Sequence, residues 1–279
     1  MKKWNLVIDV GRCHDCNDCF LADKDEFVDN EWLPTALAQP RHGQRWMNIE
    51  RKERGQYPLV QVAYLPLPCQ HCGDAPCMKA SPAGTIYRRP DGLVIIDPVK
   101  AKGHPEIVKA CPYGAIYWNE EAQVPQKCTG CAHLLDEGWT ETRCSQVCPT
   151  DAIKLVLAED AEMAARAAAE GLESYKADLA SSPRVYYKNL HLWTRSFLAA
   201  SVVYKDTDEC AEAVKVTVSQ AGKKVGETLT NNYGDFLVDH LAPGATYTLT
   251  LEASGYRPLS QDVALEASLS LGQLYLEKA

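Results

Sequence analysis

The sequence contains no run of roughly 18 consecutive apolar residues, the length at which a membrane-crossing helix becomes a candidate. Its first ten residues include two lysines but no apolar stretch of signal-peptide length. We therefore expect no membrane span, no export signal and a cytoplasmic location. No basic run interleaves lysine or arginine with aromatic residues either, which argues against nucleic-acid binding.

Motifs for several kinds of catalysis are also missing. No glycine-rich phosphate loop follows an expected strand, no flavin or nicotinamide fingerprint is present, and no nucleophile-base pair stands out. Any chemistry on a substrate must therefore take place on another chain. The composition is otherwise ordinary: 46% hydrophobic residues and a net charge of -8 over 279 residues suit a folded protein long enough for two domains.

Cysteine is abundant, and its distribution is uneven. Eleven of the twelve cysteines lie between Cys13 and Cys148, and only Cys210 lies beyond them. A disulfide scaffold fits poorly, because disulfide-dense folds are usually short secreted domains. Cysteines two residues apart, repeated in sets, instead resemble the ferredoxin run C-x2-C-x2-C-x3-C-P, whose fourth thiolate binds the other cluster. The isolated Cys210 is expected to be a small buried hydrophobic residue.

An internal hexapeptide repeat marks the place of this exchanged fourth ligand. Its copies begin at Ser81, Cys111 and Cys148, and read SPAGTI, CPYGAI and CPTDAI. Four runs follow from the ferredoxin spacing, with longer gaps in the second and fourth. The runs are Cys13, Cys16, Cys19 and Asp23; Cys69, Cys72, Cys77 and Ser81; Ala101, His104, Ile107 and Cys111; and Cys128, Cys131, Cys144 and Cys148.

In the ferredoxin pattern, paired runs exchange their fourth members. We pair the first run with the fourth and the second with the third. This pairing uses all eleven cysteines and predicts three clusters. Site A takes Cys13, Cys16, Cys19 and Cys148; site B takes Cys69, Cys72, Cys77 and Cys111; site C takes Cys128, Cys131, Cys144 and Asp23. A fourth site would consist of Ala101, His104, Ile107 and Ser81. All four of its thiolates are missing together, which chance would rarely produce.

Alternative roles for some of these residues stay open at this point. A closed zinc site has similar four-thiolate spacing, and it would use Cys128, Cys131, Cys144 and Cys148. It would leave the first three cysteines without a fourth. Asp23 is either a carboxylate ligand of a cubane or a solvated acid beside a three-iron cluster, because iron-sulfur chemistry favours thiolate. We expect His14, His71 and His133, which adjoin cysteines, to be surrounding or surface groups.

The rest of the chain predicts two further segments after an iron-sulfur domain at residues 1–155. Residues 156–196 contain a stretch rich in helix formers from Glu159 to Leu179, interrupted by Gly171, and this is expected to be a connector packed on the first domain. Residues 197–279 show strand alternation at Val214, Val216 and Val218, a turn at 231–234, and alternation again at 247–251.

Several short strands in this region predict a small β-sandwich, and their order resembles the transthyretin-like or prealbumin-like sandwiches. The expected fold class is therefore α+β, with a duplicated ferredoxin-like Fe-S domain followed by a small C-terminal β-sandwich.

The exchanged-cysteine plan, with C-x4-C spacing in the second run, resembles the electron-transfer subunits of the DMSO reductase family of molybdopterin enzymes. Four further segments resemble the small subunits of pyrogallol-phloroglucinol transhydroxylases and the related resorcinol hydroxylases. They are residues 45–51, 111–121, 128–136 and 183–190. This similarity covers essentially the whole chain, with Asp23 standing where a fourth cysteine is expected.

The resemblance implies a non-catalytic electron-transfer subunit of a molybdenum-dependent enzyme that hydroxylates or transhydroxylates phenolic aromatics. Its partner is expected to be a large catalytic subunit carrying molybdenum bis-pyranopterin guanine dinucleotide, in a heterodimer or larger complex. One alternative is an Fe-S subunit of another enzyme of the same family, acting on sulfur, arsenic or formate compounds. The other is a zinc-binding interaction module without redox activity, which metal analysis would distinguish.

Overall fold

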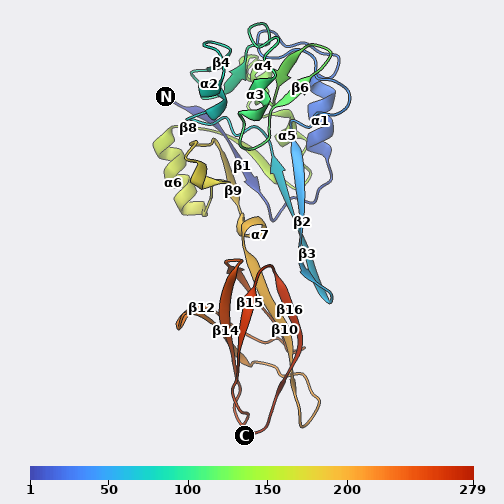
Figure 1. Cartoon of the computed structure of the whole chain (residues 1–279), viewed down its shortest axis with the longest axis vertical. Helices are drawn as coiled ribbons and strands as arrows, with labels where there is room; N and C mark the ends of the chain where they lie inside the picture. The colour runs from blue at the N-terminus through green and yellow to red at the C-terminus, as the bar shows by residue number, and fades with distance from the viewer. The chain divides into compact units, whose positions relative to one another are not determined.

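The computed structural model describes residues 1–279, which divide into two compact units (Figure 1). The first unit comprises residues 1–50 and 64–190, and the second comprises residues 51–63 and 191–279. None of the helices combines the length and hydrophobicity that crossing a bilayer requires. Short helices and strands in the first unit, and a β-sandwich in the second, confirm the predicted α+β class.

A three-stranded sheet joins distant parts of the first unit. Its central strand β1 (Lys3–Asp9) pairs antiparallel with β8 (Ile153–Ala158) and parallel with β9 (Val185–Lys188). Ile8 lies opposite Ile153 in the antiparallel pair. The loop that follows β1 and the turn that precedes β8 therefore meet at the same end of the sheet.

The segment expected to be a connector contains α6 (Asp160–Glu170), which buries Met163 in an apolar core that also contains Val7. Gly171 ends this helix with a φ of 64°, a left-handed conformation that glycine adopts without a steric penalty. Near the expected end of the stretch, the chain forms the short 3-10 helix η1 (Ala177–Leu179).

Two similar helix-hairpin segments contain the first two copies of the internal repeat. In the first, α2 (Pro76–Ala80) precedes the hairpin of β4 (Ile86–Arg88) and β5 (Val94–Ile96). In the second, α3 (Glu106–Lys109) precedes the hairpin of β6 (Tyr117–Asn119) and β7 (Val124–Gln126). The remaining helices of the cysteine-rich part are α1 (Asp18–Phe27), α4 (Ala132–Asp136) and α5 (Arg143–Gln146).

The repeat has a common backbone geometry at its fourth position. Gly84, Gly114 and Asp151 all occupy this position, with φ angles of 77°, 66° and 53°. A left-handed residue turns the chain sharply. In the two copies that begin with cysteine, the turn lets the next N–H donate to that cysteine's Sγ, from Ala115 to Cys111 at 3.4 Å and from Ala152 to Cys148 at 3.2 Å.

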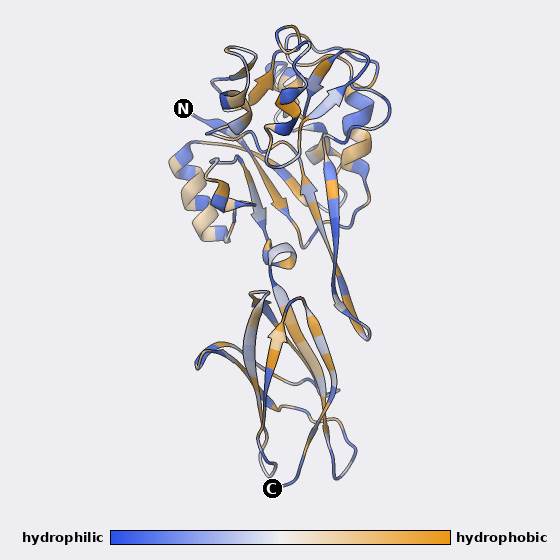
Figure 2. Ribbon diagram, in the orientation of Figure 1, coloured by the Kyte–Doolittle hydropathy of each residue, from blue (hydrophilic) through white to orange (hydrophobic).

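The second unit contains a two-sheet sandwich, as predicted. One sheet has the strand order β13-β10-β16 and the other β12-β11-β14-β15. The strands are β10 (Ser196–Tyr204), β11 (Lys215–Gln220), β12 (Lys223–Leu229), β13 (Asp235–Leu241), β14 (Ala245–Glu252), β15 (Leu259–Leu265) and β16 (Leu269–Leu276). The predicted inward positions, including Val216, Val218, Leu249 and Leu251, are buried in one apolar core, and hydrophobic stretches along these strands are visible in Figure 2. The short helix α7 (His191–Thr194) precedes β10.

A hairpin from the first half of the chain also belongs to this unit. It consists of β2 (Asn48–Gln56) and β3 (Leu59–Leu67), whose residues 51–63 group with the sandwich. Arg54, with only 1% of its side chain exposed, donates to Asp239 Oδ1 at 2.7 Å and to Gln61 Oε1 at 3.0 Å. A buried ion pair therefore fixes the hairpin to β13.

Cys210 is exposed, so the prediction of a buried cysteine is wrong. It forms a backbone bridge with Val203 at the end of β10. Adjacent side chains in an extended segment point to opposite sides, and here Ala211 is the fully buried one.

Candidate iron-sulfur sites

Site A is assembled by the β1–β8 pairing. Cys13 and Cys16 lie in the loop after β1, Cys19 lies in the first turn of α1, and Cys148 lies in the turn after α5. We call two groups electrostatic neighbours when the charge of one affects the pKa of the other. Cys13 has Cys148 and Cys16 as electrostatic neighbours, and Cys19 has Cys13 and Cys16. The four predicted members are therefore together. Cys16 is exposed, Cys13 and Cys148 are half-buried, and Cys19 is buried.

Site B lies inside the largest apolar core of the first unit. Cys69 follows β3, Cys72 lies in the next loop, Cys77 lies on α2, and Cys111 follows α3. Cys77 has each of the other three as an electrostatic neighbour. All but the half-buried Cys111 are buried. The sequence-predicted set is again brought together, although its third and fourth members are far apart in the chain.

Site C joins the segment around α4 and α5 to α1. Cys128 follows β7, Cys131 precedes α4, and Cys144 lies on α5, which packs against α1. Cys131 has Cys144, Cys128 and Asp23 as electrostatic neighbours. Asp23 is only 7% exposed and accepts a 3.4 Å hydrogen bond from Gln39 Nε2. It is therefore a buried carboxylate beside three thiols rather than a solvated acid.

Site C adjoins both other sites. Cys19 of site A is an electrostatic neighbour of Cys144 in site C, and Cys128 of site C is an electrostatic neighbour of Cys69 in site B.

The residues of the missing fourth site serve other purposes. Ala101 and Ile107 have no exposed surface and belong to an apolar core. His104 pairs with Glu106 at 2.8 Å, and Ser81 Oγ donates to the carbonyl of Met78 at 3.2 Å. Packed hydrophobic side chains thus stand where two ligands would have been required.

The zinc site considered from the sequence receives no support from the geometry. It needs Cys148 beside Cys128, Cys131 and Cys144, but the cysteine near Cys148 is Cys13. In addition, no three His, Cys, Asp or Glu side chains come close enough to hold a single metal ion. A cubane places less demand on proximity, because each of its ligands binds a different iron.

Burial and hydrogen bonding act in opposite directions on these thiols. Burial raises the pKa of Cys77 to about 12 and that of Cys144 to about 11. Burial also raises the pKa of Asp23, to about 7, despite the hydrogen bond from Gln39. Bound iron would displace these protons, since a coordinating thiol is deprotonated.

Several backbone N–H groups already point at the sulfur atoms. Besides those of the repeat, Gly130 donates to Cys128 Sγ and Arg143 to Cys131 Sγ, both at 3.4 Å. His71 donates to Cys69 Sγ at 3.5 Å. Hydrogen bonds of this kind stabilise thiolate ligands and contribute to the reduction potential of a cluster.

None of the three histidines occupies a ligand position of the predicted sites. His14 is exposed. His133 Nε2 lies 2.8 Å from Glu26 Oε1, and the His133 ring stacks on Trp32. His71 is buried, and its Nδ1 accepts from the Val94 N–H at 3.0 Å. Sequence reasoning missed Lys127, which is 3% exposed and lies among thiols of two sites. Its only sequence signal is its position directly before Cys128.

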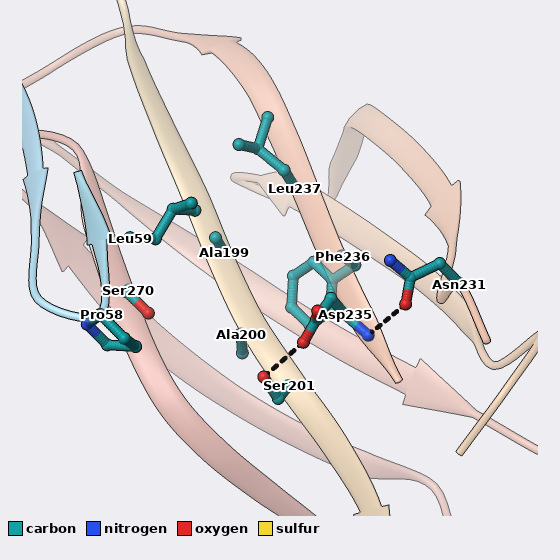
Figure 3. Close-up of a pocket in the computed structure, with 10 residues that line it drawn as sticks. All are labelled: Pro58, Leu59, Ala199, Ala200, Ser201, Asn231, Asp235, Phe236, Leu237 and Ser270. Carbon is teal, nitrogen blue, oxygen red and sulfur yellow. Dashed lines mark hydrogen bonds between the residues drawn. The ribbon is translucent and has the colours of Figure 1, made fainter. Parts of the chain in front are cut away.

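A cavity of about 460 Å3 lies in the second unit (Figure 3). It is lined by the β2–β3 turn, β10, β13 and β16. Its one carboxylate, Asp235, accepts a 2.5 Å hydrogen bond from Ser201 Oγ, and its N–H donates to Asn231 Oδ1 at 2.9 Å. These two hydrogen bonds link Ser201, Asp235 and Asn231, and no cysteine or histidine lines the cavity.

Two regions of the chain match known domain families. Residues 60–158 match the 4Fe-4S dicluster domain family, and residues 199–273 match the carboxypeptidase regulatory-like domain family. The chain is 43% identical to the pyrogallol hydroxytransferase small subunit of Pelobacter acidigallici, over 99% of this chain and 100% of that protein. It is 31% identical to the thiosulfate reductase electron transfer subunit PhsB of Salmonella typhi, over 57% of this chain and 78% of that protein.

A third relative matches a smaller part of this chain. The selenate reductase subunit beta of Thauera selenatis is 40% identical over 36% of this chain and 30% of that protein. These two relatives match only part of the chain, whereas the match to the Pelobacter protein also includes the C-terminal sandwich. This chain therefore belongs to the family of iron-sulfur small subunits that includes the pyrogallol hydroxytransferase small subunit.

Proposed function

We propose that this chain carries three iron-sulfur clusters, at sites A, B and C, for a molybdopterin-containing catalytic subunit that hydroxylates or transhydroxylates phenolic rings. The single observation that carries the proposal is the similarity to the pyrogallol hydroxytransferase small subunit over the whole chain. We place the ligands on the eleven clustered cysteines, with Asp23 completing site C. We also assign the complex to the cytoplasm, which cell fractionation would test.

Orphaned polar groups beside the cysteines fit clusters at these positions. Thr129 Oγ1 and His71 Nε2 are buried and have no hydrogen-bond partner within the chain. Thr129 lies between Cys128 and Cys131, and His71 lies between Cys69 and Cys72. A buried donor without an acceptor is costly. The inorganic sulfides of a cluster would provide such acceptors, and the cluster would supply one-electron redox chemistry.

The adjacency of site C to sites A and B supports an electron path. Hydroxylating a ring with water releases two electrons, which must leave the catalytic subunit one at a time through one-electron carriers. Transfer of a hydroxyl group between two rings releases none. The two versions of the activity therefore differ in whether substrate reduces the clusters of this chain.

The proposed activity predicts what the purified native complex contains and does. We expect a tagged form of this chain to bring down a large subunit with molybdenum, and the complex to turn over pyrogallol, phloroglucinol or resorcinol. Product analysis under anaerobic conditions measures this, and bleaching of the brown colour by substrate identifies a hydroxylase. Turnover of thiosulfate, selenate or dimethyl sulfoxide with no activity on phenols would contradict the proposed substrate class.

A further inference from the structure

Lys127 is a buried cation located between two of the proposed clusters. It lies between β7 and Cys128, and only 3% of it is exposed. Its Nζ donates to the carbonyl oxygens of Val94 and Cys128, the latter at 3.1 Å. Two carbonyls satisfy part of its hydrogen-bonding capacity but carry no compensating charge.

The strongest electrostatic partners of Lys127 are thiols. They are those of Cys69 and Cys77, from site B, and Cys128, from site C, with Cys69 also within hydrogen-bonding reach. Lys127 therefore lies beside proposed ligands of two sites.

A buried charge without a partner of opposite sign is strongly unfavourable. Several exposed lysines of this chain pair with carboxylates, as Lys79 does with Asp74 at 2.8 Å. At Lys127 the strongest electrostatic partners are thiols, which become permanent anions when iron binds. The buried cation thus fits a pair of negatively charged clusters and fits poorly with neutral thiols.

We propose that Lys127 is a positioning residue whose fixed charge stabilises the reduced forms of the clusters at sites B and C. This inference rests on the cluster binding proposed above. A reduced cluster carries one more negative charge than the oxidised one, so a cation beside it raises its reduction potential. Each transfer moves a single electron between two clusters, and the proton of Lys127 does not move.

The test is Lys127→Met, which removes the charge and keeps most of the stem. An electron paramagnetic resonance titration with dithionite measures the three potentials, after signals are assigned with Cys148→Ser, Cys111→Ser and Cys131→Ser. We expect the one-electron reduction constants of sites B and C to fall about tenfold, which is a shift of about 59 mV to lower potential. The cysteines of site A are not among the strongest electrostatic partners of Lys127, so site A serves as an internal reference.

Lys79→Met is the matched control, because Lys79 lies two residues from Cys77 but has 65% of its side chain exposed. It should leave all three potentials unchanged. Unmoved potentials in Lys127→Met, or an equal shift at all three sites, would overturn the proposal. Wild-type protein without iron-sulfur clusters would instead overturn the proposed function itself.

Lys127→Arg covers the case in which Lys127→Met assembles no clusters. Clusters in the arginine variant with potentials near the wild-type values would show that the charge is what the site requires. Two other results would show that the lysine acts through packing. In one, neither variant loads iron. In the other, the arginine variant loads iron but has lowered potentials at sites B and C. Either of these results would contradict the proposal.

Discussion

Removing iron from the purified chain is expected to unfold the first unit and leave the second unit folded. The helices that carry or adjoin cysteines are short: α2 and α4 have five residues each, and α3 and α5 have four. Isolated helices of fewer than about 12 residues are marginal in water. Clusters at sites A, B and C would tie these pieces together, so that metal binding contributes directly to folding.

The second unit has no such dependence. Its core is formed by the two sheets of the sandwich and contains no cysteine. Hydrogen exchange after treatment with an oxidant and a chelator measures both units in the same sample. Protection should disappear for amides of β1 and β8 and persist for those of β11 and β14. Loss of protection in both units together would contradict independent folding of the sandwich.

Point variants refine the same experiment. Cys148→Ser should remove the cluster at site A and increase exchange along the β1–β8 pair, which ends beside that site. Cys210→Ser is the matched control, since Cys210 is the one exposed cysteine outside the three sites. It should change neither the iron content nor the exchange pattern.

Substituting Asp23 is expected to change the cluster at site C and no other. Asp23 is buried and has Cys128, Cys131 and Cys144 as neighbours. A carboxylate holds iron of a cluster more weakly than thiolate does. Mild oxidation should therefore convert wild-type site C to a three-iron form, whereas Asp23→Cys should resist conversion and shift the potential of that cluster.

Asp23→Ala should produce the three-iron form without oxidation, so that iron falls by about one atom per chain. Asp25→Ala is the matched control: Asp25 lies on the same helix, but 78% of its side chain is exposed. Iron analysis and electron paramagnetic resonance measure the outcome. Identical iron content and spectra for Asp23→Ala and wild type would show that Asp23 is not a ligand.

The exchange rule for cysteines grouped thiols that are electrostatic neighbours in the structure, and their ligation of clusters stays a prediction. The rule reflects that a loop with cysteines at every third position can reach only part of a cubane, so the fourth ligand must come from elsewhere. The left-handed turns of the repeat were not predicted, although two of its three copies have glycine at that position. Strand alternation predicted the inward residues of the sandwich, since burial of one sheet face fixes a period of two.

Contacts between residues far apart in the sequence were not predictable in this way. Nothing near Arg54 indicates that it pairs with Asp239, because neither residue has a local pattern that specifies the other. The burial of Lys127 was missed for a related reason: lysine is usually exposed, and only the surrounding fold shows that its neighbours are thiols. Cys210 was misjudged because one isolated cysteine gives no period from which to assign a face.

Iron and acid-labile sulfide analysis of the native protein tests the central claim most directly. Three cubanes at sites A, B and C predict about twelve iron and twelve sulfide per chain, and about eleven iron if site C is a three-iron cluster. A value near sixteen iron would mean that the exchange scheme is wrong, because Ala101 and Ile107 leave no ligands for a fourth cluster. Stoichiometric zinc without sulfide would contradict an electron-transfer function altogether.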